Sequence, residues 1–519
     1  MTLAHQVRQL QTLLLSFHPI IVIETVEEER VQTLLNAVVE DMKMALFEWS
    51  VTQGLARSRV DNRWTDECAP ASAQKPAALD RTNDPFEALK AIQEVVPRSV
   101  FLLKDFATHL SDPVLARQLR EVAQTFSQTR SALVLSGDSI NLPSEIAHDA
   151  VYFDLGLPGR DELQQAVGDV IRSLRAKNRV DVSIQNQDVH QLVTALRGMT
   201  LKQARQVIAY AALEDGKLAI NDVHRILERK AQIIREESLL EYIPINGNGK
   251  QPDSTTAPVE LGGFAGLKQW LTRARVGFSP QAQAFNLHPP KGILIVGIQG
   301  CGKSLAAKAI AHAWTMPLLK LDAGRLYDKY VGESEKNFRK VIKLAESMAP
   351  CVLWIDEIEK SLGHSGSDSD GGLSQRLFGC FLTWMQEKSE DVFVVATANN
   401  ISQIPPELLR KGRFDEIFFV DLPDEQERGV ILRIHLAQRK QNPQQFDLPN
   451  LVAATNGYSG AEIEQAVVTA LYNALFLQKA LDTELLLQAI RSTVPLSVSR
   501  REDLERLRMI AQERFVNAR

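Results

Sequence analysis

The sequence predicts an α/β fold built on a parallel sheet, and three observations carry this prediction. A glycine-rich octapeptide, GIQGCGKS at residues 297–304, follows the apolar run at 293–296 and precedes an alanine-rich helical segment. The continuous apolar run 351–355 has the pattern of a strand that is buried on both faces, and residues 392–399 are predicted as the next strand. Apolar runs in the same order occur in the N-terminal half, which predicts a second α/β unit there.

Length and composition narrow the class of protein. A chain of 519 residues is too long for one core, so we expect roughly two to four domains. Hydrophobic residues make up 45% of the chain and charged residues 24%, as in ordinary globular proteins. The formal net charge is -5, and because no global basic field results, a nucleic-acid partner is not expected.

The cysteines and the apolar runs bear on location. Four cysteines are scattered without CxxC spacing, which indicates a reducing compartment and neither a zinc site nor a disulfide framework. No apolar run approaches the roughly 18 residues of a membrane span, so we expect no membrane partner. The short apolar stretch at 13–15 precedes polar and acidic residues, unlike a cleavable signal. We therefore expect a cytoplasmic protein.

The octapeptide predicts a loop that cradles phosphate groups. Its glycines let backbone N–H groups point at an anion, and the N-terminus of the following helix adds its positive dipole end. Lys303 is expected to reach the β and γ phosphates of a nucleoside triphosphate, and Ser304 to take one coordination site of Mg²⁺. A turn that uses glycines for backbone reasons alone is the alternative. The candidate binding residues in this loop are Gly297, Ile298, Gln299, Gly300, Cys301, Gly302, Lys303 and Ser304.

Polar side chains follow the two strands predicted downstream of this loop. Asp356 and Glu357 come directly after residues 351–355, at the edge where parallel strands present their carboxyl ends to ligands. We expect Asp356 to hold the Mg²⁺ shell through water, and Glu357 to orient and polarise the attacking water. The alternative is an acidic helix N-terminus after a core strand. Asn399 ends the next strand, where it could hydrogen-bond the γ phosphate or the lytic water.

Five stretches, GIQGCGKS, CVLWIDE, VVATANN, PPELLRKGRFD and GYSGAEI, occur in the order and approximate spacing of the AAA-type ATPases. The chain therefore resembles this family, which implies an AAA+ three-layer P-loop module with a helical lid, and ATP and Mg²⁺ as cofactors. The resemblance also implies a homo-oligomeric ring, expected to be hexameric. In such a ring Arg410 and Arg413 would reach the neighbouring subunit's nucleotide as arginine fingers. Two solvated surface arginines are the alternative.

The resemblance implies further contacts. Gly262 lies in a segment that matches the one packing on adenine, and Gly460 and Ala461 open the lid helix near the base and ribose. Between the cradle and the acidic strand lies the place of the family's pore loop, which grips substrate polypeptide and so implies an unknown protein client. The candidate pore-loop residues are Tyr330, Val331 and Gly332. An ordinary packing role for Tyr330 is the alternative.

The N-terminal half repeats segments of the second half. Residues 192–200 align with 451–459 without a gap, and residues 99–106 overlay 351–358. We therefore expect a degenerate AAA-like module, because residues 26–30 (VEEER) stand where a phosphate cradle would need glycines and a lysine. Three acids at that helix N-terminus would repel a triphosphate. An unrelated α/β domain with chance similarity is the alternative.

Composition predicts the boundaries between parts. The expected order is a degenerate N-terminal module at 1–238 (lid about 176–238, loop insertion about 56–84), a linker at 239–258, the ATPase large subdomain at 259–428, its lid at 429–495 and a C-terminal helix at 496–519. We expect this last helix to pack against the lid or a neighbouring subunit. A second loop, 363–372, is expected to face the pore.

Over its whole length the sequence resembles AAA proteins encoded by cyanobacteria and red-algal plastid genomes, which predicts a cyanobacterial cytosol or a plastid stroma as its location. A part in regulating photosynthesis or CO₂ utilisation is suspected from this resemblance. Two function classes follow: an ATPase that remodels or threads a protein client, and an ATP-dependent assembly switch or adaptor without threading. A thiol at Cys301, near a helix N-terminus, allows redox control, and a tolerated small residue is the alternative.

Overall fold

The computed structural model describes residues 3–58, 79, 81–94, 98–176, 181–182, 186–219, 222–237, 239–243, 263–321, 333–361, 373–388, 391–410 and 412–518. The chain divides into two compact units, Met1–Ile220 and Asn221–Arg519. Gly262 and the candidate pore-loop residues Tyr330, Val331 and Gly332 lie outside the described residues, as do the loop at 363–372 and most of the insertion at 56–84.

The first unit is built on a six-stranded sheet. In spatial order its strands are β3 (Gly54–Arg57), β2 (Ala45–Ser50), β4 (Ser99–Lys104), β5 (Ala132–Gly137), β1 (Ile20–Glu24) and β6 (Ala150–Tyr152). The edge strand β3 pairs antiparallel with β2, and the other neighbours pair in parallel. Alternate residues of β1 enter different buried clusters, Ile20 on one face of the sheet and Ile21 on the other.

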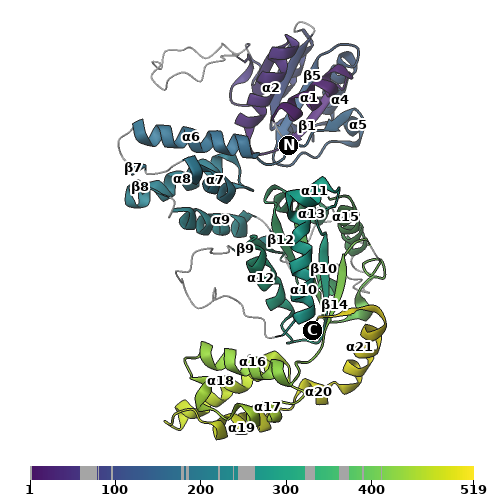
Figure 1. The fold of residues 1–519 in the computed structure, drawn as a ribbon. Helices are drawn as coiled ribbons and strands as arrows, with labels where there is room; N and C mark the ends of the chain where they lie inside the picture. The colour runs from purple at the N-terminus through teal and green to yellow at the C-terminus, as the bar shows by residue number, and fades with distance from the viewer. Residues whose placement is uncertain are drawn as a thin grey trace. The chain divides into compact units, whose positions relative to one another are not determined.

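Helices cover both faces of this sheet, which makes three layers (Figure 1). Helices α1 (Leu3–Leu15) and α2 (Glu28–Met42) pack on one face, and α3 (Pro85–Glu94) and α4 (Pro113–Phe126) pack on the other. A helical part follows in the chain, in which α6 packs against α7 and α8. Its bounds are α6 (Arg160–Ala176), α7 (Asn186–Leu196) and α8 (Leu201–Asp215).

The second unit is built on a seven-stranded sheet. In spatial order its strands are β15 (Val516–Asn517), β14 (Glu416–Val420), β10 (Gly292–Gly297), β13 (Val392–Ala398), β12 (Cys351–Ile355), β11 (Leu318–Leu321) and β9 (Leu240–Ile243). The segment predicted as a linker therefore begins with a strand, which pairs antiparallel with β11 and buries Leu240 and Tyr242. Helix α9 (Val223–Glu237) packs on β9 and belongs by its contacts to this unit.

The helices of the second unit form three layers with the sheet and a separate lid (Figure 1). Helices α10 (Ala265–Ala274) and α12 (Lys303–Trp314) contribute to the buried cluster on one face, and α13 (Glu333–Ser347) and α15 (Leu373–Glu387) to the cluster on the other. The lid has a buried cluster of its own. Its helices are α16 (Glu425–Gln438), α17 (Leu448–Ala454), α18 (Gly460–Phe476) and α19 (Thr483–Ser492).

The two sheets share one strand order. Without the extra edge strands, the spatial orders are β6-β1-β5-β4-β2 and β14-β10-β13-β12-β11. When the strands of each set are renumbered 1 to 5 along the chain, both orders become 5-1-4-3-2. The register agrees with the predicted overlay of 99–106 on 351–358, because Val100 pairs with Ala132 as Val352 pairs with Phe393. The predicted α/β fold, with an AAA-like module before the P-loop module, is thereby confirmed.

The C-terminal segment bonds to the lid where it begins. The Leu496 N–H, in α20 (Leu496–Ser499), donates to Glu462 of α18 at 2.7 Å. After α21 (Arg501–Arg514), the strand β15 pairs with β14. Arg508 binds Asp421 through two nitrogens, at 2.9 and 2.8 Å. The predicted lid contact is thus found at the start of this segment, whereas its last residues complete the sheet edge, and packing on a neighbouring subunit stays a prediction.

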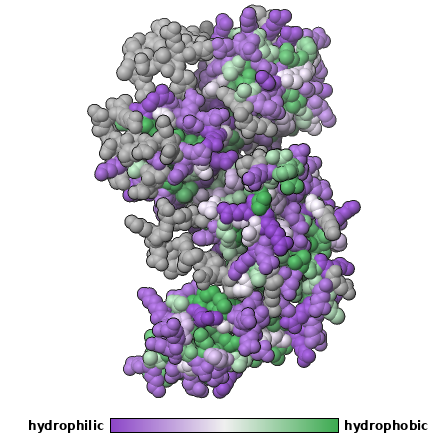
Figure 2. All heavy atoms as spheres, in the orientation of Figure 1, coloured by the Kyte–Doolittle hydropathy of each residue, from purple (hydrophilic) through white to green (hydrophobic). Residues whose placement is uncertain are grey.

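The surface and the helix lengths bear on membrane association. Within the described ranges, no helix is both long and apolar enough to cross a membrane. Figure 2 shows hydrophilic residues over most of the visible face of each unit, with hydrophobic residues in small groups between them. Small groups of this kind are ordinary on folded domains.

Candidate active site

The glycine-rich loop joins a fully buried strand, β10, to helix α12, which is the setting that a phosphate cradle requires. Gly300 and Gly302 have φ values of +77° and +85°, in the left-handed region that favours glycine. A Cβ on Gly297 would lie 2.1 Å from the Val420 carbonyl oxygen, so a side chain does not fit there. These glycines are therefore needed for the path of the loop itself.

Lys303 begins helix α12 and is almost fully buried, with 6% of its surface exposed. Its Nζ donates to the carbonyl oxygens of Gly297 at 2.8 Å and Ile298 at 2.7 Å. Burial lowers the pKa of Lys303 to about 8, although the nearby charges of Cys301 and Glu359 act in the opposite direction. A bound phosphate would favour the charged amine, so this buried cation suits an anionic ligand.

Ser304 and Asp356 lie side by side at the carboxyl edge of the sheet. The Ser304 hydroxyl donates to Asp356 Oδ1 at 3.4 Å, and the Thr397 hydroxyl donates to the same oxygen at 2.6 Å. Hydroxyl and carboxylate oxygens are hard ligands, and Mg²⁺ usually takes only one or two protein ligands beside water and phosphate. Ser304 and Asp356 could therefore supply one or both protein ligands of such an ion.

Glu357 follows β12 with a strained backbone. Its φ of +49° is uncommon for a residue with a side chain, and such strain concentrates at functional sites. Its N–H donates to Thr397 Oγ1 at 3.1 Å. Its carboxylate accepts from Asn399 Nδ2 at 2.7 Å and from Lys360 Nζ at 2.8 Å. The structure thus brings the predicted pair Glu357 and Asn399 together.

Three side chains at this edge were not predicted from the sequence. Thr397 contacts both Asp356 and Glu357, as described above, and Lys360 pairs with Glu357. Glu359 accepts a hydrogen bond from the Asn399 N–H at 2.8 Å. Each lies within three residues of a predicted one, and that proximity was the only sequence signal that could have found them.

The lid helix α18 begins directly beside the cradle. The Ala461 N–H donates to the Gly300 carbonyl oxygen at 3.0 Å, and a Cβ on Gly460 would lie 3.3 Å from that oxygen. Ser459 and Glu462 form a capping box at the start of this helix. The predicted residues Gly460 and Ala461 therefore lie against the phosphate loop, where small residues allow close approach.

Arg410 and Arg413 lie in the segment between β13 and β14, on either side of Gly412, whose φ is +97°. Arg410 is exposed, and Arg413 donates to the Glu407 carbonyl oxygen. Among the described residues, no hydrogen bond or ion pair joins either arginine to Lys303 or the acidic strand end. The structure thus assembles the cradle, the serine, the acids and the asparagine, and leaves the two arginines apart from them.

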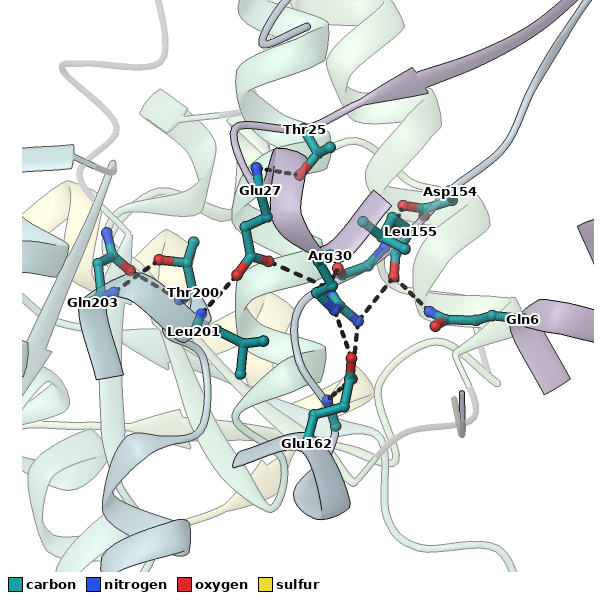
Figure 3. A network of polar contacts seen from close by, with 12 residues as sticks. Gln6, Thr25, Glu27, Arg30, Asp154, Leu155, Glu162, Thr200, Leu201 and Gln203 are labelled. Carbon is teal, nitrogen blue, oxygen red and sulfur yellow. Dashed lines mark hydrogen bonds and ion pairs between the residues drawn. The ribbon is translucent and has the colours of Figure 1, made fainter. Parts of the chain in front are cut away.

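The corresponding place in the first unit is filled by its own side chains (Figure 3). After β1 the chain passes through Thr25 and Glu27 into α2 with no glycine. Glu27 is mostly buried, and its Oε1 accepts the N–H of Leu201, the first residue of α8, at 2.6 Å. Burial raises the pKa of Glu27, against the lowering effects of this bond and of the Arg30 charge.

Arg30 extends this network to a further helix of the first unit. It is 4% exposed and binds Glu162 of α6 through two nitrogens, at 2.7 and 3.0 Å (Figure 3). It also donates to Glu27 at 3.2 Å and to the Gly156 carbonyl oxygen at 2.6 Å. These bonds join the sheet layer of the first unit directly to its helical part.

The signs of two charges are exchanged between the units. Lys303 is the first residue of α12, and Asp356 follows the strand β12. In the first unit, Glu28 is the first residue of α2, and Lys104 ends β4 at the place that aligns with Asp356. Lys104 Nζ lies 3.5 Å from Glu28 Oε2 and 3.3 Å from Glu48 Oε2. The cations near that helix N-terminus, Lys104 and Arg30, are thus paired with carboxylates of the same unit.

Known families match both units. The model of the ATPase family associated with various cellular activities (AAA) matches residues 293–422. The N-terminal and second domains of SpoVK-like AAA ATPases match residues 6–155 and 161–237.

Relatives match nearly the whole chain. An AAA domain-containing protein, ycf46, of Pyropia yezoensis is 36% identical over 504 residues, which are 96% of this chain and 96% of that protein. The ycf46 protein of Guillardia theta is 34% identical over 505 residues, 96% of this chain and 94% of its own. A cell division cycle protein 48 homolog of Archaeoglobus fulgidus is 26% identical over 400 residues, 73% of this chain and 54% of its own.

Geometry and similarity lead to the same family. A glycine loop, a buried lysine and adjacent serine and aspartate oxygens form one edge of the second sheet, and full-length relatives exceed 30% identity. The chain therefore belongs to the AAA ATPases, together with the ycf46 AAA domain-containing proteins, and it hydrolyses ATP with Mg²⁺ as cofactor.

Proposed function

We propose that this ATPase works as a homo-oligomeric ring, hexameric as expected from the family resemblance, that remodels or threads a protein client. One observation supports the ring: in the second unit every predicted catalytic group lies at the site except the two arginines. Arg410 and Arg413 share no bond with that group within the described residues, so a second copy of the chain is the natural source of the transition-state cation.

Each side chain at the site has a chemical role in this proposal. Lys303 attracts the β and γ phosphates, while Ser304 and, through water, Asp356 would hold the Mg²⁺ that neutralises phosphate charge. Glu357 orients the attacking water and accepts its proton at the carboxylate. Asn399 holds that carboxylate in place through its Nδ2 atom. The loop N–H groups and the start of α12 complete the anion site.

A mixing experiment tests whether the arginines act between subunits. Lys303→Ala removes the phosphate cation of a subunit, and the double variant Arg410→Ala, Arg413→Ala removes the fingers that it offers to its neighbour. Each preparation alone should hydrolyse ATP at a small fraction of the wild-type rate. A mixture should recover activity, because some intact cradles then face intact arginines. Mixtures that stay inactive while forming mixed rings, as native mass spectrometry would show, contradict the proposal.

Client threading rests on the family resemblance and on Tyr330, which lies outside the described residues. Tyr330→Ala should keep basal ATP hydrolysis but lose its stimulation by a chemically unfolded protein probe. The rival function, an assembly switch or adaptor, predicts instead that the probe has no effect on wild type and that Tyr330→Ala is indistinguishable from it. Glu357→Gln, which should bind ATP without turnover, is the variant with which to capture the client.

For the first unit we propose a role without nucleotide, as a scaffold or partner-binding module. The support is the network in which Glu27 bonds to Leu201 and Arg30 to Glu162, where a nucleotide would otherwise join core and lid. Equilibrium dialysis of the full chain should find one ATP bound per chain in wild type and none in Lys303→Ala. Two sites in wild type, or one remaining in the variant, would show a nucleotide in the first unit.

We propose a plastid stroma or a cyanobacterial cytosol as the location, and a part in regulating photosynthesis or CO₂ utilisation. The support is the full-length similarity to proteins of Pyropia yezoensis and Guillardia theta. A deletion strain should grow more slowly than its parent under limiting inorganic carbon, and a copy carrying Glu357→Gln should not restore growth. Equal growth of deletion and parent strains would count against this part of the proposal.

A further inference from the structure

We infer that Glu359 is a positioning residue for ATP hydrolysis, which fixes the backbone of Asn399 and through it the orientation of the Glu357 carboxylate. This inference rests on the proposed role of Glu357. Glu359 lies in the short helix α14 (Ile358–Ser361), directly after the acidic strand end, and is 6% exposed.

The bond to Asn399 lies directly after the last paired residue of β13, since β10 pairs with β13 as far as Ala398. The parallel ladder between β12 and β13 ends with Ile355 opposite Ala396. Beyond it, side chains replace the ladder: Thr397 bonds to Asp356, and Glu359 Oε1 accepts the Asn399 N–H at 2.8 Å. The Asn399 N–H is therefore held by a carboxylate, directly after the residue at which strand pairing with β10 ends.

The side chain of Asn399 passes this constraint to the catalytic acid. Its Nδ2 donates to Glu357 Oε1 at 2.7 Å, so the bonds run from Glu359 through Asn399 to Glu357. A charged acceptor makes a stronger hydrogen bond than a neutral one and holds its donor more firmly. Without it, Asn399 gains freedom, and Glu357 loses the partner that sets the direction of its carboxylate.

The burial of Glu359 argues for a role beyond folding. Its Oε2 atom has no hydrogen-bond partner among the described residues, although it is shielded from solvent. A buried carboxylate that is only half satisfied is costly, and unsatisfied groups of this kind are found where chemistry needs them. Glu359 is also among the charges that raise the pKa of Lys303, which places it within electrostatic reach of the cradle.

The inference predicts a specific kinetic pattern. Glu359→Ala should lower kcat about tenfold or more, while KM and the Kd for ATP change by less than about threefold. Glu359→Gln should keep kcat within about threefold of wild type, because its amide oxygen can still accept the Asn399 N–H. The exposed acid Glu387, on α15, provides a control, since Glu387→Gln should behave as wild type. Thermal melting of every variant checks that it is folded.

A double-mutant cycle separates positioning from a merely structural role. If Glu359 acts through Asn399, the double variant Glu359→Ala, Asn399→Ala should be no slower than Asn399→Ala alone, within about twofold. The inference would be overturned if the double variant lost kcat by the product of the two single losses. It would also be overturned if the affinity for ATP fell in parallel with kcat. If Glu359→Ala does not fold, Glu359→Asp supplies the cycle, with an intermediate kcat expected.

A separate variant tests the proposed function on which the inference rests. Glu357→Gln should abolish turnover. Retained turnover in this variant would refute the role of Glu357 itself. Lost turnover in Glu357→Gln, combined with wild-type kcat in Glu359→Ala, would refute only the role of Glu359.

Discussion

The two α/β modules of this chain have the same strand order but opposite chemistry at one corresponding place, the entry to the helix that follows β1 in the first module and β10 in the second. In the second module a glycine loop leads to the buried Lys303, whereas in the first module the chain passes Glu27 and begins α2 with Glu28. The comparison teaches that the sheet does not depend on this loop. Strand pairing and two apolar faces are enough to maintain the topology with different side chains at this place.

The contacts between core and lid differ in the same way. Both lid helices start with a capping box, Thr200 with Gln203 in the first module and Ser459 with Glu462 in the second. In the second module the helix start touches the loop through a neutral carbonyl oxygen. In the first, the N–H of Leu201 meets a carboxylate. A built-in anion thus takes the place at which the other module is open to a phosphate.

The largest effect is expected for the cradle lysine. Lys303→Ala should weaken ATP binding by about a hundredfold or more, because a buried cation in contact with phosphate is lost. Isothermal calorimetry on the full chain measures this directly. The comparison between modules would be broken if the variant still bound one ATP with unchanged affinity, since that nucleotide would have to lie in the first module.

A matched pair of acids sharpens the comparison next. Glu357 and Asp105 occupy aligned positions, and both have positive φ values, +49° and +54°. Glu357→Gln should reduce ATP turnover by about a hundredfold or more with ATP still bound, as expected on loss of a general base. Asp105→Asn should leave turnover within about twofold. A steady-state assay that found a large loss for Asp105→Asn would assign chemistry to the first module.

The ion-pair network of the first module should be important for its stability. Arg30→Met leaves the mostly buried carboxylates of Glu27 and Glu162 without their cation, which should cost roughly 3–5 kcal/mol. Calorimetric unfolding should show a lower transition temperature for the first module than in wild type. The rise in the transition temperature of the second module on addition of ATP should be the same as in wild type. The control Glu29→Gln loses only an exposed pair with Arg205 and should change stability by less than about 0.5 kcal/mol. Equal effects of both variants would contradict the role of the network.

The smallest effect is a dependence of ATP affinity on pH. Burial lowers the pKa of Lys303 from 10.5 to about 8. Below that pH the amine is already charged, and above it ATP binding must first protonate it, so affinity should fall by up to about tenfold per pH unit. Calorimetry at about pH 8.5 in two buffers with different ionisation heats should reveal proton uptake. Lys303→Arg, which stays charged, should lack this proton uptake. A wild-type protein that also binds ATP without proton uptake would contradict the prediction.

Much of the fold could be predicted from local pattern. An apolar run before the glycine-rich loop located β10, and runs ending in polar residues located β12 and β13. The overlay of the two halves anticipated their common strand order. The strand β9 was missed because its four residues lie in a segment that was predicted as a linker, and its pairing with β11 spans a long stretch of chain. Local periodicity carries no information about such distant partners.

The candidate site was predicted less completely than the fold. The motifs located Lys303, Asp356 and Asn399, because these residue types at these spacings have a known chemistry. They did not reveal that Glu359 holds the Asn399 backbone or that Glu27 reaches Leu201. Both are bonds between residues far apart in the chain, and many acidic side chains in the sequence could equally have made them.

The left-handed backbone at Asp105 has a consequence for protein engineering. The turn that places Glu357 in the second module persists at Asp105 in the first, although Lys104 now stands where an aspartate would be needed. In a redesign of the first module the turn after β4 could therefore be kept, whereas the residues between β1 and α2 and the bonds of Glu27 and Arg30 would have to be replaced.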